Sequence, residues 1–122
     1  MPYNPGTQLK KAQIRALPKS ISDYVLSLQS RYSTRHCKLY IENPGWELYL
    51  DEGATYNFYY GDKESSLQMM SESTFHAGGI KESYQIGRRV EIPQGGWVVG
   101  FELFLGKPII NVHHVGNYQL PA

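Results

Sequence analysis

The chain has 122 residues, of which 41% are hydrophobic and 19% are charged, with 12 Gly and 7 Pro. This composition excludes a disordered chain and indicates a single globular domain, residues 1–122, that is rich in turns and long enough to bury a core without metal. The net charge of +1 excludes a uniformly basic or acidic protein, and the single cysteine, Cys37, excludes an internal disulfide and favours a reducing compartment.

The first part of the chain is predicted to be helical after a loose tail, residues 1–6. A short helix capped by Thr7 is expected to run through Leu17, where Pro18 stops it, and a second helix is expected to begin at Ser20 or Ser22. In this second helix the apolar residues recur at helical spacing, namely Ile21, Tyr24, Val25, Leu28 and Tyr32. We therefore expect residues 7–35 to form a helical layer over one face of a sheet.

From residue 38 onward the hydrophobic period changes to two, which is typical of strands. Turn-forming Gly, Pro, Asn and Asp separate the predicted strands, which are 38–41, 46–50, 56–60, 83–92 with a bulge at Gly87, 97–105, 109–115 and a short last strand at 118–120. The first two are expected to pair as a hairpin. Residues 64–81 show no clear period and are expected to contain a mobile loop.

The most regular pattern lies in residues 97–105, where one face of the strand is wholly apolar and the other is mixed and includes Glu102. A loop with an even number of residues places the apolar face beside the apolar face of the next strand. Pro108 has no N–H for a two-residue turn starting at residue 106, so we expect a four-residue loop through Ile109. This register puts Glu102 opposite His113.

Together these elements predict a β-rich α+β fold. One or two N-terminal helices over residues 7–35 are followed by an antiparallel sheet over 38–120, arranged as a β-sandwich or open barrel of six to eight strands. The longest nearly apolar run, 97–105, is about half of what a membrane-spanning helix needs, and no basic start with an apolar run is present. We therefore expect no membrane span and a cytoplasmic protein, unless a leader has been removed or export is unconventional.

Charge is distributed unevenly along the chain. Residues 1–40 carry seven Lys or Arg against one carboxylate, a net charge of +6, and residues 41–86 carry eight carboxylates against two Lys, a net charge of −6. The basic segment either meets an anionic partner such as nucleic acid or lies against the acidic sheet of its own fold or of a second copy. The second alternative is preferred, because no aromatic residue is interleaved with the basic cluster for stacking on bases.

No motif for phosphate binding, zinc binding, redox chemistry or a nucleophilic serine is present. Neighbouring residues on a strand point to opposite faces, so His113 and His114 are not expected to share one ion; His114 is expected in the core and His113 on the surface. His36 and Cys37 are also neighbours on a strand, so they are not expected to act as a pair. Cys37 is expected to be inert. The sequence therefore predicts no metal, no cofactor and no assigned catalytic residue.

One enzymatic alternative is a small metal-free ribonuclease, because the predicted order of helices followed by a sheet is similar to that of small nucleases. Such an enzyme needs a base, a histidine acid and a cation for the phosphate. Glu102 and His113 would be cross-strand neighbours, and Arg88 or Arg89 would supply the positive charge. An ordinary pair on the solvent face of a sheet explains the same residues and is preferred.

The aromatic content is the stronger functional signal, with ten Tyr and two Trp. Tyrosine combines an apolar ring with a polar tip, and clusters of exposed rings bind proteins or stack on sugars. High strand propensity also explains many tyrosines in a sheet. The candidate ligand-binding residues are Trp46, Tyr49, Tyr56 and Tyr59.

The sequence thus favours a non-enzymatic binding module that recognises a protein or a carbohydrate, and whose uncovered sheet edges make a homo-oligomer. Two alternatives are kept. The first is the small ribonuclease or a nucleic-acid-binding domain, and the second is an interaction protein that neutralises a partner such as a toxin.

Overall fold

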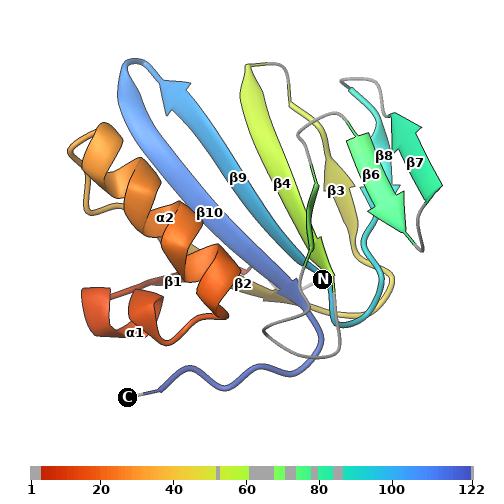
Figure 1. Cartoon of the computed structure of the whole chain (residues 1–122), viewed down its shortest axis with the longest axis horizontal. Coiled ribbons are helices and arrows are strands. Elements are labelled where there is room, and N and C mark those ends of the chain that lie inside the picture. Colours follow the sequence, from red (N-terminus) through yellow and green to blue (C-terminus); the bar gives the residue numbers. More distant parts are fainter. Residues whose placement is uncertain are drawn as a thin grey trace.

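The computed structural model describes residues 4–51, 53–60, 68–70, 74–77, 80–83 and 87–121. The elements within these residues are β1 Thr7–Gln8, α1 Lys11–Arg15, α2 Lys19–Arg31, β2 Lys38–Glu42, β3 Glu47–Tyr49, β4 Ala54–Tyr60, β5 Gln68–Met70, β6 Thr74–Ala77, β7 Ile80–Ser83, β8 Arg89–Glu91, β9 Trp97–Phe104 and β10 Lys107–Val115 (Figure 1). The fold is strand-rich with two short helices, as predicted. The described part of the chain has ten strands, which is more than the six to eight expected.

Six strands form one sheet in the order β1-β2-β10-β9-β4-β5. Neighbours in this sheet run antiparallel except β2 and β10, which are parallel, with Leu39 opposite Val112. The sheet is therefore mixed, and the prediction of a purely antiparallel sheet is wrong. Short loops force only consecutive strands to be antiparallel, whereas β2 and β10 are separated by most of the chain and can meet in either direction.

The predicted hairpin between residues 38–41 and 46–50 is wrong, because β3 does not pair with β2. Instead β3 pairs with β8 in a separate two-stranded ribbon, in which Leu48 lies opposite Val90. Leu48, Leu50, Val90 and Ile92 are all buried against the main sheet, so this pairing provides an apolar cover that a β2–β3 hairpin would not. A sandwich or barrel is not confirmed in the described residues, where one sheet is accompanied by this ribbon and by a second ribbon, β6–β7.

The helical layer is not the first element of the chain, which corrects the predicted order. Thr7 and Gln8 form β1 on the edge of the sheet beside β2, and the N–H of Leu9 donates to the carbonyl of Cys37 at 2.8 Å. Helix α1 is therefore shorter than predicted. Helix α2 begins directly after Pro18, with no side-chain cap from serine. Neither of the two described helices is long and apolar enough to cross a membrane.

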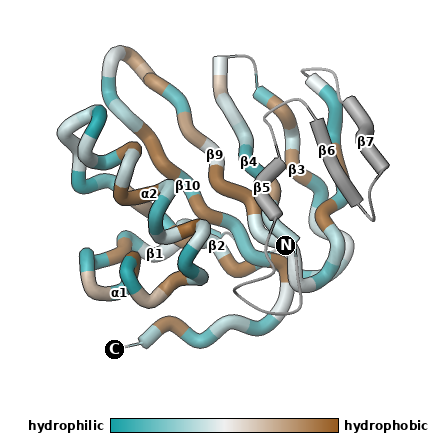
Figure 2. Tube along the Cα trace, viewed as in Figure 1, coloured by the Kyte–Doolittle hydropathy of each residue, from teal (hydrophilic) through white to brown (hydrophobic). Residues whose placement is uncertain are grey.

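The two faces of the sheet have separate cores. On one face, helices α1 and α2 cover Val99, Phe101, Ile110 and Val112 (Figure 1). On the other face the β3–β8 ribbon covers a smaller cluster that contains Val98, which alternates with the residues of the first face. Figure 2 shows hydrophobic residues concentrated along β9 and β10. The central strands are therefore buried from both sides.

The β9–β10 hairpin confirms the predicted even loop but not its length. Phe104 lies opposite Lys107, so the loop is Leu105-Gly106, and both residues have positive φ, 52° and 80°. This is the backbone of a type I′ turn, which matches the strand twist and places the turn before Pro108. The four-residue loop and the pairing of Glu102 with His113 are therefore wrong.

The segment between β4 and β9 and the end of the chain both differ from the sequence prediction. Strands β5, β6 and β7 lie within or beside the segment that was expected to contain a mobile loop, whose other residues, 64–67, 71–73 and 78–79, lie outside the described part of the chain. Of the predicted strand with a bulge at Gly87, residues 84–86 lie outside the described part of the chain, and its second half is the short strand β8, which begins at Arg89 and pairs with β3. The predicted last strand is wrong: Tyr118 lies in an irregular segment and packs edge-on against Trp97.

Candidate functional site

One face of the sheet carries the side chains of the candidate site. Tyr56 of β4 lies opposite Gly100 of β9, which lies opposite Asn111 of β10. Because side chains alternate along a strand, Glu102 and His113, each two residues from this row, lie on the same face. All five residues belong to the face that the β3–β8 ribbon covers only in part.

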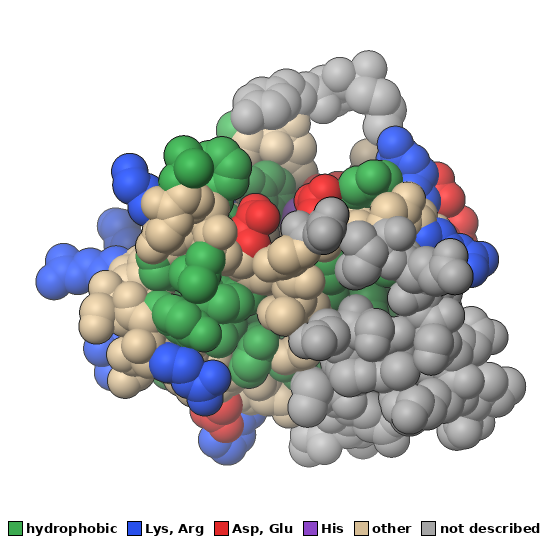
Figure 3. Space-filling model, turned by 90° about the horizontal axis from the view of Figure 1, so that it is seen from above, with side chains coloured by type: hydrophobic (Ala, Val, Ile, Leu, Met, Phe, Trp, Pro, Cys, Tyr) green, Lys and Arg blue, Asp and Glu red, His purple; other side chains and the backbone are tan. Residues whose placement is uncertain are grey.

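A cleft of about 220 Å³ opens between this face and the end of β3. Its polar lining consists of Tyr49, Asp51, Tyr56, Glu102, Asn111 and His113. The charged groups are the carboxylates of Asp51 and Glu102, and no described residue of the lining is Lys or Arg. We call this site the acidic cleft. Figure 3 shows acidic side chains and a histidine that meet in a hollow among hydrophobic side chains.

Tyr56 and Gly100 build the floor of the acidic cleft. A Cβ atom on Gly100 would lie 3.2 Å from the Tyr56 ring, so glycine is what lets the ring lie across the strand. The Tyr56 hydroxyl accepts a hydrogen bond from the N–H of Asp51 at 2.9 Å and donates to the carbonyl of Tyr49 at 3.3 Å. Burial, reinforced by the charges of Asp51 and Glu102, raises the pKa of Tyr56, so this hydroxyl stays protonated and ties the end of β3 to the sheet.

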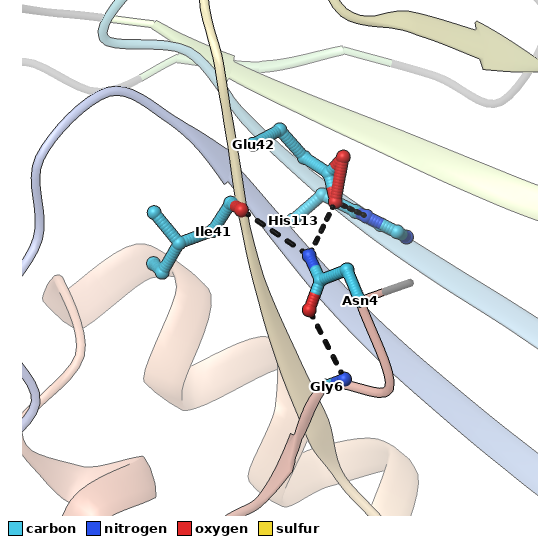
Figure 4. Close-up of polar contacts among 5 residues, drawn as sticks. All are labelled: Asn4, Gly6, Ile41, Glu42 and His113. Atoms are coloured by element: carbon cyan, nitrogen blue, oxygen red, sulfur yellow. Dashed lines mark hydrogen bonds and ion pairs between the residues drawn. The ribbon is translucent and has the colours of Figure 1, made fainter. Parts of the chain in front are cut away.

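His113, at one end of the cleft, is held between two aromatic rings. Its ring centroid lies 4.8 Å from that of Tyr40 and 4.7 Å from that of Trp46, with interplanar angles of 17° and 20°. Nδ1 of His113 lies 3.8 Å from Oε1 of Glu42, and the Asn4 amide donates to the same oxygen at 3.1 Å (Figure 4). The imidazole is thus fixed in plane and position.

The four aromatic residues predicted to bind ligand do not form one surface. Tyr49 is 47% exposed at the rim of the cleft, with the Arg89 guanidinium 5.6 Å from its ring centroid. Trp46 is half-buried on His113, and Tyr56 is buried in the floor. Tyr59 is 1% exposed and packs in the core under the helices, on the opposite face of the sheet.

The residues of the ribonuclease alternative are brought together only in part. Glu102 and His113 both line the acidic cleft, although they lie opposite Ile109 and Val98 rather than each other. Arg88 and Arg89 are exposed and neither is a lining residue, although the Arg89 guanidinium lies near the Tyr49 ring at the rim. The cleft therefore contains a base and a histidine, but the cation that a phosphate needs is not among its described lining residues.

His36, His114 and Cys37 have structural surroundings. His114 lies on the helix face, buried, with its ring centroid 4.1 Å from that of Trp97, as predicted, whereas His113 is half-buried rather than exposed. Nδ1 of His36 accepts a hydrogen bond from the N–H of Ile110 at 3.0 Å. Burial raises the pKa of the Cys37 thiol to about 12, which makes it unreactive at neutral pH. No group of three metal-binding side chains occurs in the described residues.

Sequence reasoning missed four residues of the site. Asn111 and His113 share a face by the period of two, so Asn111 could have been named with His113. Tyr40 and Glu42 reach His113 through the parallel pairing of β2 with β10, for which the sequence carries no local signal. At Asp51 the local sequence, Asp-Glu-Gly, indicates only a turn.

Comparison of the chain with known protein families, with curated proteins and with solved structures finds no match.

Proposed function

We propose that the protein is a non-enzymatic binding module whose acidic cleft takes a neutral sugar residue of a carbohydrate. The observation that carries this proposal is the combination of two carboxylates, one amide and tyrosine rings in a single cleft. Carboxylates accept hydrogen bonds from sugar hydroxyls, and the Asn111 amide both donates and accepts. The half-exposed ring of Tyr49 adds an apolar surface at the rim.

Charge favours a neutral polyol over a phosphate. Asp51 and Glu102 give the cleft a negative potential that repels phosphate oxygens, and no Lys or Arg among its described lining residues offsets that potential. The volume of about 220 Å³ is below the ~300–1,000 Å³ typical of drug-sized ligand sites. A single sugar ring, or the terminal residue of a glycan, fits this size better than an extended chain.

A titration with monosaccharides and their methyl glycosides, followed by two-dimensional ¹H–¹⁵N NMR, tests the proposal. We expect shifts at the amides of Gly100, Asn111 and Tyr56. Glu102→Gln should weaken binding about tenfold, because a hydrogen bond to a charged group is worth ~1.5–3 kcal/mol. The matched control is Glu91→Gln, an exposed carboxylate on β8, which should leave the affinity unchanged. Equal losses in both variants, or shifts confined to other residues, would refute the assignment.

A second candidate ligand is a basic side chain of a protein partner. It is favoured by the same two carboxylates, which would pair with a guanidinium or ammonium group, and by Tyr49, whose ring already lies near Arg89. The two candidates differ in salt dependence. Binding of an acetylated arginine amide would weaken as salt rises, whereas binding of a neutral sugar would not.

We also propose that the protein self-associates. The tip of the β9–β10 hairpin exposes three consecutive apolar residues, Leu103, Phe104 and Leu105, at 53%, 60% and 87%. Contiguous exposed apolar residues are typical of protein contact sites. Sedimentation velocity of wild type and of Phe104→Ser should show a larger species that the substitution reduces to monomer; a monomeric wild type at all concentrations would exclude self-association.

We further propose a cytoplasmic location, which the single reduced and buried thiol of Cys37 supports. Fractionation of cells that express the native chain tests this point. Recovery of the protein from the culture medium would contradict it.

A further inference from the structure

A second concavity lies on the other side of the molecule, between β1, α1 and α2. It has a volume of about 760 Å³, within the ~300–1,000 Å³ range of small-molecule sites. Four of its lining residues are cations, namely Lys10, Lys11, Arg15 and Arg35, and none of its described lining residues is acidic. We call it the basic groove. Figure 3 shows Lys and Arg side chains along the helical side of the molecule, on the left, with hydrophobic side chains beside them.

The four cations have no ion-pair partner among the described residues. The nearby carboxylate on α2, Asp23, is paired with Lys19 instead. Lys11 and Arg15 are four residues apart on α1, so their like charges lie on the same face of the helix and destabilise it. Within the described part of the chain, the cations therefore do not stabilise the fold by pairing. A bound anion would remove this repulsion.

The floor of the basic groove is aliphatic. Leu9 and Ile14 close its base with 3% and 1% of their surface exposed, and the half-buried Leu26 is the more accessible apolar side chain. The methylene stems of Lys and Arg side chains can extend such an apolar surface. No aromatic residue is among the described lining residues, so bases have nothing to stack on. An aliphatic floor beneath a cationic rim matches a ligand with an apolar chain and one anionic end.

We propose that the basic groove binds a small aliphatic anion, with its chain against Leu9, Ile14 and Leu26 and its carboxylate or phosphate held by Lys11, Arg15 and Arg35. The planar guanidinium groups suit both anions, because each can donate two parallel hydrogen bonds. This site is separate from the acidic cleft, which shares no lining residue with it.

Isothermal titration calorimetry with sodium hexanoate, octanoate and decanoate, each below its micelle concentration, tests the proposal. We expect the affinity to rise about fourfold per added methylene, which corresponds to ~0.8 kcal/mol per buried CH₂. Decyltrimethylammonium, which has the same chain and the opposite charge, should not bind. An affinity that is independent of chain length, or equal binding of the cationic amphiphile, would overturn the proposal.

The double variant Lys11→Gln/Arg15→Gln separates binding from folding. It should weaken decanoate binding about tenfold or more while leaving the melting temperature unchanged or raised, because it removes a like-charge pair. Arg35→Gln, on a different segment, should weaken binding without altering α1. The control Lys107→Gln, exposed at the hairpin tip, should bind like wild type. Wild-type affinity in both groove variants would show that these cations do not hold the ligand.

Discussion

The two faces of the six-stranded sheet are covered by different means. On the helix face, α1 and α2 cover the middle of the central strands, where Val99, Ile110 and Val112 have no accessible surface. On the other face the β3–β8 ribbon buries Val98 and Phe58 but ends before it reaches Glu102 and Asn111. This difference shows that the polar side chains of the acidic cleft lie where the covering layer is incomplete.

This comparison also separates two uses of aromatic rings. On the helix face rings fill the core, and the ring centroid of Phe101 lies 4.6 Å from that of Tyr32. On the opposite face Tyr56 uses its hydroxyl to hold a neighbouring segment, and Trp46 positions His113. Rings of the same type therefore contribute to stability on one side and to the geometry of a site on the other.

The largest effect is expected from removal of a ring on the helix face. Trp97→Ala or Phe101→Ala should lower the free energy of unfolding by about 3–5 kcal/mol, because each ring is at least nine-tenths buried and its loss leaves a cavity. Urea denaturation followed by circular dichroism measures the loss.

The control for that measurement lies on the same strand and the same face. Leu103 is 53% exposed beyond the end of the helical cover, so Leu103→Ala should change the free energy of unfolding by less than about 0.5 kcal/mol. A loss below about 1 kcal/mol for Trp97→Ala would show that the helix face is not the main core.

Much of this face could be predicted from local pattern. The period of two assigned the faces of β9, and helical spacing identified Ile21, Val25 and Leu28 as the buried side of α2. The length of the hairpin loop could not be predicted, because Leu105 adopts a left-handed conformation that its residue type does not favour.

A smaller effect is expected from the floor of the acidic cleft. Tyr56→Phe keeps the ring over Gly100 but removes the hydroxyl that joins Asp51 to Tyr49, so the free energy of unfolding should fall by about 1 kcal/mol. Sugar binding should weaken as well, because the end of β3 is no longer held. Unchanged stability together with full binding would show that the hydroxyl does not position this segment.

The candidate site was harder to predict than the core for a physical reason. Tyr56 and Tyr59 are three residues apart and therefore lie on opposite faces, but nothing in the sequence shows which face the helices cover. Glu42 and Tyr40 reach His113 only through the parallel pairing of β2 with β10, a contact between distant segments. Pattern within a strand assigns a side chain to a face, whereas the site depends on which other segments meet that face.

The pH dependence of stability offers a third test, on the helix face. Burial lowers the pKa of His114 below its ordinary value of 6.5. The unfolded chain then binds a proton more readily than the native chain, so the stability is fully present above pH 6.5 and is lost as pH falls through that value. His114→Phe, which retains a ring against Trp97, should flatten this fall between pH 7 and pH 5. An unchanged slope in thermal melts would assign the pH dependence to other groups.

The last prediction is that the protein does not cleave RNA. A ribonuclease would need a cation to stabilise the phosphate in the transition state, and the charged lining of the acidic cleft consists of Asp51 and Glu102. Wild type and His113→Ala incubated with RNA should therefore leave it equally intact on a denaturing gel. Cleavage by wild type that disappears in His113→Ala and in Glu102→Gln would establish the catalytic alternative, because contaminating nuclease would remain in both variants. It would also show that a cation reaches the cleft when RNA is bound, since the two carboxylates alone would repel the substrate.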